Sequence, residues 1–321
     1  MNNEKISVII ASFNGIKYIS QQLDSIRTQT RIPDEVIISD DCSTDGTLEF
    51  CRAYISQHGL TGWKVFQNEK NLGFAKNFRH AFTLSNLAGK KGNIVFTCDQ
   101  DDIWMPDKIQ VMSHTIINNS QIMLLVSNYI PFNESDGKKI QAHVRYINRD
   151  DGEIIQFRLS DTWLEPLRPG CTYCFRSELL EKFHVFDIEG SAHDGRLWRY
   201  AIISDSLYLL NRQLIRYRRH ESTTTQVFKS QKPANLKSRV TSSLNLANFY
   251  MTFVNAPEES GITKRNRELL AQKAKFLTKR SKVLARKNLF AIILFVFVNI
   301  KYYPTMRNAL SDIYAAIFLK N

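Results

Sequence analysis

Residues 6–46 read ISVIIASFNGIKYISQQLDSIRTQTRIPDEVIISDDCSTDG, and this stretch contains a strand, a helix and a second strand. Ile6–Ala11 is apolar and rich in β-branched residues, which is typical of a strand buried on both faces. Apolar residues then recur with helical spacing over Gly15–Thr28, and Glu35–Ser39 is again a short apolar run. Two buried strands joined by a helix predict a parallel βαβ unit.

The same alternation continues through the first third of the chain. We expect a helix over Thr47–Ser56, a strand over Trp63–Gln67, a helix over Phe74–Leu87 and a strand over Asn93–Thr97. Strands separated by helices of this length predict an α/β fold with a mostly parallel central sheet flanked by helices.

Polar residues follow three of these strands where each strand ends. The segments are Ser12-Phe13-Asn14, Asp40-Asp41 and Asp99-Gln100-Asp101-Asp102. Ligands of open α/β sheets bind beyond the carboxyl ends of the strands, so we expect the three segments to meet at one edge.

The last of these segments places three aspartates within four residues. Like charges so close repel each other, and a divalent cation that also binds phosphate would relieve the repulsion. The alternative is a solvated acidic loop in which Asp102 caps the next helix. The position directly after the apolar run NIVFTC favours a metal site.

Four motifs together resemble family 2 glycosyltransferases, and two further segments continue the resemblance more loosely. The four are VIIASFNG (8–15), IISDDCSTDGT (37–47), NEKNLGFAKN (68–77) and TCDQDDIWMPDK (97–108), followed by AHDGRLW (192–198) and IRYRRHEST (215–223). The resemblance implies the GT-A fold and a nucleotide-sugar donor. The DQDDIW form and the later HD are most similar to bacterial rhamnosyltransferase-type enzymes that build surface polysaccharides such as O-antigen or capsule.

The resemblance also implies which residues contact the donor. The end of the first strand would lie along the base and ribose, and Asp40 would accept from the N3–H of uracil or thymine. The loop that contains Lys76 would close over the nucleotide, and Asp102 could touch the sugar. The expected donor-binding residues are Ala11, Ser12, Phe13, Asn14, Asp40, Asp41, Asn71, Gly73, Lys76, Asp99 and Asp102.

By the same resemblance, Asp101 would coordinate Mg²⁺ or Mn²⁺ bound to the diphosphate, with Asp99 contacting the metal or the ribose. His220 matches a histidine that completes the metal site in some relatives, although a lone histidine is as often a surface or packing residue. Asp194 matches the catalytic base of an inverting transfer. Without the resemblance, Asp194 would be taken as a helix cap.

Two departures bear on the substrate. Gly195 and Arg196 stand where rhamnosyltransferase-type relatives usually have aromatic residues, which leaves the sugar and the acceptor open. Gln213–Tyr217 is similar to the QxxRW of processive synthases, but Tyr217 replaces the tryptophan and the expected transmembrane helices are missing. We therefore expect one sugar to be added. A non-catalytic protein that binds a nucleotide sugar or scaffolds an assembly complex is the alternative.

The net charge of +12 is unevenly distributed. Residues 1–230 contain 27 basic and 27 acidic side chains, whereas residues 231–321 contain 16 basic and 4 acidic ones. We expect a glycosyltransferase domain over 1–230 and a basic helical region over 231–321. No RNA- or DNA-reading motif accompanies the charge, so nucleic acid is excluded as a partner.

The basic region is predicted to bind a membrane surface or a second subunit. Lys264–Lys287 forms a basic helix with an apolar stripe, which is typical of helices that bind anionic membranes. The apolar run Leu289–Ile300 is too short to span a bilayer, which takes about 20 residues. A helical bundle that packs on the body or forms a homodimer is the alternative. The stripe consists of Leu269, Leu270, Phe276, Leu277, Val283 and Leu284.

Compartment and acceptor follow from the remaining features. Five scattered cysteines do not form a disulfide framework, and the first residues lack the features of a signal peptide. We therefore expect a cytoplasmic enzyme, peripheral on the inner face of the membrane. The resemblance implies an acceptor glycan carried on polyprenyl diphosphate.

Overall fold

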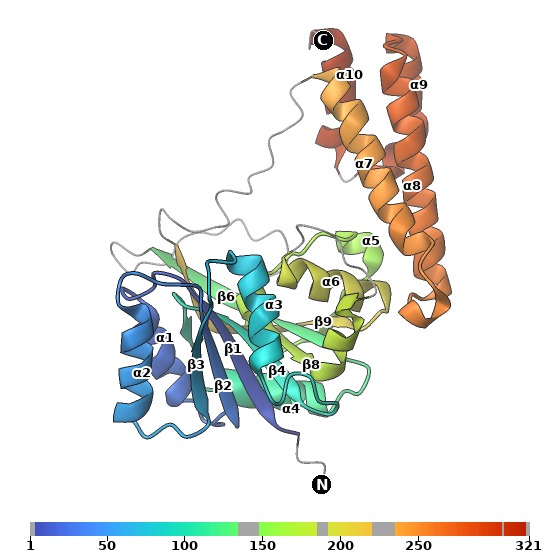
Figure 1. The fold of residues 1–321 in the computed structure, drawn as a ribbon. Helices are drawn as coiled ribbons and strands as arrows, with labels where there is room; N and C mark the ends of the chain where they lie inside the picture. The colour runs from blue at the N-terminus through green and yellow to red at the C-terminus, as the bar shows by residue number, and fades with distance from the viewer. Residues whose placement is uncertain (1–3, 134–147, 185–191, 220–234, 304, 319–321) are drawn as a thin grey trace. The chain divides into compact units, whose positions relative to one another are not determined.

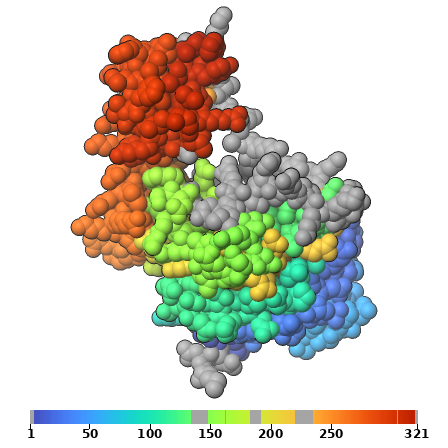
Figure 2. All heavy atoms as spheres, turned by 180° about the vertical axis from the view of Figure 1, so that it is seen from behind, coloured from blue at the N-terminus to red at the C-terminus, as the bar shows by residue number. Residues whose placement is uncertain are grey.

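The computed structural model describes residues 4–133, 148–184, 192–219, 235–303 and 305–318, and the remaining residues are grey in Figure 1 and Figure 2. The chain divides into two compact units, Met1–Glu221 and Ser222–Asn321. The boundary that the charge distribution predicts, between residues 230 and 231, falls within 220–234 and thus outside the described residues.

The first part of the first unit alternates strands and helices. Its elements are β1 (Ile6–Ser12), α1 (Ile19–Arg27), β2 (Glu35–Asp40), α2 (Thr47–Gln57), β3 (Trp63–Gln67), α3 (Phe74–Leu84) and β4 (Ile94–Asp99). Helix α1 begins four residues after Gly15, because Gly15 and Ile16 donate their N–H groups to Thr47 and Asp45 in a turn. Helix α3 ends before Ser85, whose hydroxyl bonds the Glu35 carboxylate.

The second part of this unit is more irregular. Its elements are β5 (Ile103–Trp104), α4 (Lys108–Ile117), β6 (Leu124–Asn133), β7 (Ile154–Gln156), α5 (Leu159–Thr162), η1 (Gly170–Thr172), β8 (Tyr173–Arg176), η2 (Ser177–His184), α6 (His193–Ile203) and β9 (Leu207–Arg219).

The strands β1 to β9 form one mixed sheet in the order β3-β2-β1-β4-β8-β6-β9-β5, with β7 paired to β9. The pairs among β1 to β4 are parallel, as the βαβ pattern predicts. Beyond β4 the sheet is mixed, because β8 runs antiparallel to both β4 and β6, whereas β6 and β9 are parallel.

Helices cover the sheet on both faces. Every second residue of β1, namely Ile6, Val8 and Ile10, joins residues of α1, α2 and α4 in one buried apolar cluster. Helix α3 packs on β1 and β2 and contacts α6, and Figure 1 shows these two helices together over the sheet. The expected α/β architecture with a flanked central sheet is thereby confirmed, and a C-terminal helical extension is present.

The described part of the second unit is helical. Its elements are α7 (Leu236–Val254), η4 (Glu258–Ser260), α8 (Lys264–Ala285), α9 (Leu289–Val298), η5 (Ile300–Tyr302) and α10 (Met306–Phe318). Within the described ranges, none of the helices combines the length and the apolarity needed to cross a membrane.

The apolar stripe of α8 packs inside this unit. Leu270, Leu277 and Leu284 are buried, and α8 lies along α7. The Phe276 ring stacks on that of Phe295 in α9, with 5.7 Å between the centroids. The expectation that this stripe itself faces a membrane or a second subunit is therefore wrong, because these side chains are buried by packing within their own unit.

Candidate functional site

The register of the parallel strands brings the three polar segments together. Ser12 at the end of β1 pairs with Asp40 of β2, and Ala11 pairs on the other side with Asp99 of β4. The carboxyl ends of β2, β1 and β4 therefore form one continuous edge, which is where ligands of α/β sheets bind.

The segment that follows β1 is fixed by Gln100. The Phe13 N–H donates to Gln100 Oε1, and Gln100 Nε2 donates to the Phe13 carbonyl oxygen. The donor–acceptor distance is 2.9 Å in both hydrogen bonds. Gly15 lies directly against Gln100, since a Cβ at position 15 would stand 2.2 Å from Oε1. Asn14 adopts a positive φ of 46° and accepts at Oδ1 from the Thr44 N–H. The segment expected along the nucleotide is thus held from both neighbouring strand ends.

Asp40 is fully buried and bonded to its own chain. Its carboxylate accepts from the Ser12 hydroxyl at 3.2 Å and from both the N–H and the hydroxyl of Ser43, at 2.9 and 2.6 Å. These bonds anchor the turn between β2 and α2. Contact between Asp40 and a base stays a prediction.

Asp41 holds the loop that precedes α3. Its two carboxylate oxygens accept from the N–H groups of Leu72 and Gly73, each at 2.8 Å, and its carbonyl oxygen accepts from Asn71 Nδ2 at 3.2 Å. Gly73 has a φ of 78°, which a residue with a side chain rarely adopts. Asn71 and Gly73 are therefore tied to the end of β2, and Lys76 is exposed in the first turn of α3.

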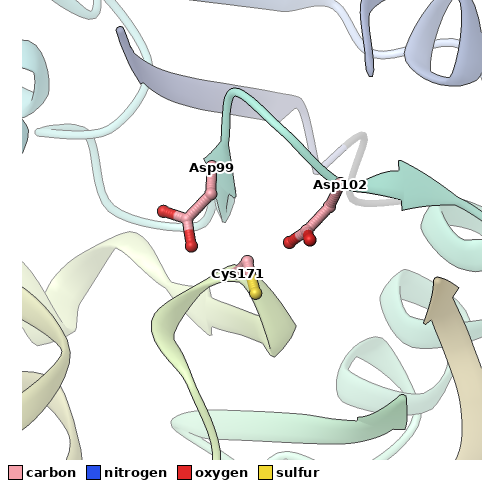
Figure 3. Close-up of side chains that lie close together, drawn as sticks. All are labelled: Asp99, Asp102 and Cys171. Carbon is pink, nitrogen blue, oxygen red and sulfur yellow. The ribbon is translucent and has the colours of Figure 1, made fainter. Parts of the chain in front are cut away.

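The acidic cluster forms around two carboxylates and a thiol (Figure 3). Ligand atoms of Asp99, Asp102 and Cys171 all lie within 4.8 Å of one another. Asp99 ends β4, Asp102 precedes β5, and Cys171 comes from η1 about 70 residues further along the chain. Figure 3 shows the three side chains facing a common space.

Burial and mutual repulsion dominate the electrostatics of this cluster. Loss of hydration, and then the charges of Asp101 and Asp194, raise the pKa of Asp99 to about 7. The pKa of Asp102 is raised well above its usual value, first by burial and then by its acidic neighbours. A bound divalent cation would reverse both effects by favouring the ionised carboxylates.

The donor set fits a hard cation that binds through oxygen. Asp102 Oδ1 accepts from the Arg218 N–H at 3.0 Å, whereas Asp102 Oδ2 is buried without a hydrogen-bond partner among the described residues. Burial raises the pKa of the Cys171 thiol well above its usual value, so this sulfur stays protonated. Mg²⁺ and Mn²⁺ prefer carboxylate oxygens, so Asp99 and Asp102 are the members of this group that could hold such an ion.

Asp101 and His220 are the two other residues expected to bind the metal. Asp101 is described and lies beside the cluster, but it is not part of the Asp99–Asp102–Cys171 group. The backbone bond from Arg218 holds Asp102 as the buried carboxylate, while Asp101 is half-buried. His220 lies outside the described residues. Coordination by Asp101 and by His220 stays a prediction.

Arg218 in β9 organises the acidic loop. Besides its N–H bond to Asp102, its Nε donates to the Asp101 carbonyl oxygen at 2.7 Å and its Nη2 to Gln21 Oε1 at 2.6 Å. The sequence presents Arg216, Arg218 and Arg219 without a reason to choose among them. The antiparallel pairing of β9 with β5 brings Arg218 to the loop.

Asp194 lies in the first turn of α6 and close to the cluster. Its charge contributes to the raised pKa of Asp99. Gly170 of η1 lets α6 come close, since a Cβ at position 170 would stand 3.0 Å from Asp194 Cβ and 2.8 Å from His193 Nε2. The Gly170 carbonyl oxygen accepts from Thr97 Oγ1 in β4 at 2.6 Å. The carboxylate expected to act as base thus lies beside the carboxylates expected to hold the metal.

His193 connects the two helices over this edge. Its ring stacks on Phe78 of α3, with 3.8 Å between centroids, and burial lowers its pKa to about 4. Neither of its ring nitrogens has a hydrogen-bond partner within the described ranges. Sequence reasoning treated His193 only as part of the HD pair, and its burial against Phe78 has no local sequence signal.

A relative of known assignment supports a transferase. The chain is 30% identical over 225 residues to dTDP-rhamnosyl transferase RfbG of Shigella flexneri. The aligned residues cover 66% of this chain and 72% of the relative.

Solved structures share the fold. TarS of S. aureus, solved in complex with UDP-GlcNAc, matches 91% of this chain and 80% of its own with a TM-score of 0.58 at 18% identity. Mannosyltransferase PcManGT from Pyrobaculum calidifontis, solved with GDP-Man and Mn²⁺, matches 97% and 85% with a TM-score of 0.51 at 17% identity. The fold is therefore GT-A.

The model of glycosyl transferase family 2 matches residues 7–183, which include the carboxyl ends of β1, β2 and β4 and the acidic cluster. With the fold and the relatives described above, this match identifies the chain as a member of glycosyl transferase family 2.

Proposed function

We propose that this protein is an inverting, metal-dependent glycosyltransferase that transfers one sugar from a UDP- or dTDP-sugar to a glycan on polyprenyl diphosphate. The observation that carries the proposal is that Asp194, in the first turn of α6, lies close enough to Asp99 for its charge to raise the pKa of that carboxyl, at the edge where Asp99 and Asp102 meet. The product of this proposed transfer would be a bacterial surface polysaccharide such as O-antigen or capsule.

The donor would lie along the ends of β1, β2 and β4. The backbone of Phe13 is fixed by Gln100, and the loop at Asn71–Gly73 is fixed by Asp41, so both sides of a nucleotide site are held in place. Lys76 in the first turn of α3 supplies a positive charge at a helix N-terminus, which favours a phosphate group.

Asp99 and Asp102 would hold Mg²⁺ or Mn²⁺, with Asp101 beside them. When bound there, such an ion supplies positive charge against the diphosphate and favours its departure. The support from this chain is the buried, unpartnered Asp102 Oδ2 and the mutual repulsion of the carboxylates.

Asp194 would act as the general base. Its carboxylate takes the proton of the acceptor hydroxyl while the hydroxyl oxygen bonds to the anomeric carbon. The bond between that carbon and the diphosphate oxygen breaks, and its electron pair leaves with the nucleoside diphosphate from the opposite face. The product therefore has the inverted anomeric configuration.

The similarity to a dTDP-rhamnosyl transferase makes dTDP-rhamnose the first donor to test. Gly195 and Arg196 follow the proposed base and replace the aromatic residues usual in rhamnosyltransferase-type relatives. A panel of donors must therefore include UDP-hexoses and UDP-N-acetylhexosamines as well.

The proposal is tested by measuring release of nucleoside diphosphate from each donor in Mn²⁺, for the wild type and for Asp194→Asn. A general base contributes about 10²- to 10⁴-fold, so the variant should lose at least a hundredfold in kcat. Asp107→Asn is the matched control, because Asp107 is a partly exposed carboxylate that pairs with Arg212 at 3.1 Å.

Two outcomes would count against the proposal. Undiminished turnover in Asp194→Asn would remove this residue from the mechanism. Tight donor binding without turnover by the wild type, over the whole panel and with lipid-linked acceptors, would favour the non-catalytic alternative.

A further inference from the structure

Helix α10 has its large apolar residues on the outside. Met306, Leu310 and Tyr314 are 60%, 53% and 56% exposed, although they recur every fourth residue and so share one face. Ile317 and Phe318 continue this face and are also exposed. The buried residues of α10 are instead Ala309, Asp312 and Ala315. Since the inner positions are small or polar, the unit's own packing does not account for the large outer side chains.

Helix α9 has an apolar surface of the same kind. It consists of apolar residues only, LFAIILFVFV, and just Ile292 and Val296 are buried. Phe290 is 76% exposed, and Leu294, Phe297 and Val298 follow on the same face at spacings of four, seven and eight residues. An entirely apolar helix is normally buried, whereas the outer side of α9 is left exposed among the residues that the structure describes.

The two helices pack against each other. We define the α9–α10 face by its exposed apolar residues, and the surface of the C-terminal helices is orange to red in Figure 2. Large contiguous apolar surfaces on soluble proteins mark interaction sites for proteins or membranes. The face consists of Phe290, Leu294, Phe297, Val298, Met306, Leu310, Tyr314, Ile317 and Phe318.

The charges around the α9–α10 face are of one sign. Lys287, Lys301 and Arg307 precede α9, follow it and begin α10, and all three are exposed. Asp312 is the one acidic residue between Lys287 and the end of α10. Its carboxylate is fully buried and bonds Arg280 at 2.6 Å, so it gives the surface no negative charge.

We propose that the α9–α10 face docks on an anionic lipid bilayer, with its apolar side chains in the acyl boundary and Lys287, Lys301 and Arg307 at the headgroups. The ten residues of α9 extend about 15 Å, half the thickness of the hydrocarbon core, so the helix lies in the surface plane. The tyrosine at position 314 has the amphipathic ring typical of the headgroup level. The functional consequence, access to a lipid-carried acceptor, rests on the proposed function.

Charge favours a bilayer over a second copy of the chain. A twofold dimer through this face would bring the same surface of both copies together, and with it both sets of cations. Like charges at an interface repel, whereas anionic headgroups attract them. A bilayer that contains anionic lipid therefore complements both the apolar and the charged part of the face.

Cosedimentation of the full chain with vesicles tests this docking. The wild type should bind phosphatidylcholine vesicles that contain phosphatidylglycerol, and bind pure phosphatidylcholine vesicles more weakly. The variant Phe290→Gln/Phe297→Gln/Leu310→Gln should lose at least tenfold in partition to the anionic vesicles. The matched control is Leu244→Gln/Leu246→Gln on α7, where both side chains are also exposed, and it should bind as the wild type does.

A second variant separates the charges from the apolar contacts. Lys301→Gln/Arg307→Gln keeps the apolar face and should lose the preference for anionic vesicles. Circular dichroism checks that each variant remains helical, and light scattering measures the oligomeric state without lipid.

Three results would overturn the inference. These are absence of wild-type binding to anionic vesicles, equal loss in the α7 control, and a wild-type dimer that the triple variant dissociates. Release of nucleoside diphosphate with a water-soluble acceptor reports on the proposed function separately, because the triple variant leaves the active site intact. Vesicle binding by an inactive protein would refute the enzyme and retain the docking surface.

Discussion

Replacing Gly170 by alanine should displace the proposed base with no change in any charged or polar group. The added methyl group would stand 2.8 Å from His193 Nε2 and 3.0 Å from Asp194 Cβ. Favourable contacts of carbon lie at about 3.5–4.0 Å, so the start of α6 must move by roughly 0.5 Å or more. His193 has little room to yield, because its ring already stacks 3.8 Å from that of Phe78.

The magnitudes follow from this displacement. A misplacement of about 1 Å at a reacting group costs on the order of a hundredfold, so half that distance should lower kcat about tenfold. Overpacking of this kind costs about 1–3 kcal/mol in the free energy of unfolding. For a unit of this size, each kcal/mol should lower the melting temperature by about 2–4 °C.

Release of nucleoside diphosphate gives kcat and the KM for the donor, and a thermal melt gives the stability. We expect kcat to fall and the donor KM to stay close to that of the wild type, because the strand ends and the loop before α3 do not contain Gly170. Gly89→Ala is the matched control, since a Cβ at position 89 would meet nothing within 4 Å. Normal kcat in Gly170→Ala would refute the placement of the base against η1.

Further predictions concern pH, the second unit and the loop that precedes α3. Because burial lowers the pKa of His193 to about 4, the folded state keeps this ring neutral while the unfolded chain takes up a proton near pH 6.5. As the pH falls from about 7.5 to 5, this difference in pKa lowers the free energy of unfolding by about 2 kcal/mol. His193→Phe should remove that part of the pH dependence in denaturant titrations. Identical pH profiles for the wild type and the variant would contradict this prediction. Asp312→Asn should lower the free energy of unfolding of the second unit by about 3–5 kcal/mol, because it leaves the guanidinium groups of Arg239 and Arg280 without their buried counter-charge. An unchanged thermal melt of this unit would show that these ion pairs do not stabilise it. Asp41→Asn replaces one of the two carboxylate oxygens that accept backbone N–H groups by an amide nitrogen. It should weaken donor binding about tenfold, measured as a rise in the donor KM. An unchanged KM would mean that other contacts hold the loop.

The residues at the strand ends could be predicted because their placement is set locally. An apolar run that ends in a polar residue defines both the strand and the point where it leaves the sheet. For β1, β2 and β4 this pattern predicted that Ser12, Asp40 and Asp99 meet at one edge. In the structure Ser12 pairs with Asp40, and the preceding residue, Ala11, pairs with Asp99. The parallel half of the sheet follows from the same pattern, since helices between strands require parallel crossovers.

The rest of the site depends on long-range contacts that have no local signal. Cys171 reaches Asp102 from η1, and Arg218 reaches it from β9, through pairings that no periodicity reveals. The orientation of α8 was likewise open, because an apolar stripe looks the same whether it faces lipid or other helices. Because the stripe of α8 packs against α7 and α9, the exposed apolar residues of α9 and α10 are the better candidates for membrane contact.

Calorimetric titration of UDP and dTDP into the full chain, in Mn²⁺ and in EDTA, tests the central claim most directly. At least one nucleoside diphosphate should bind in Mn²⁺ and bind at least tenfold more weakly in EDTA. Asp99→Asn should remove the difference, because Asp99 would be a ligand of the ion. Equal affinity with and without Mn²⁺, or an undiminished metal effect in Asp99→Asn, would mean that no metal ion held by Asp99 supports nucleotide binding.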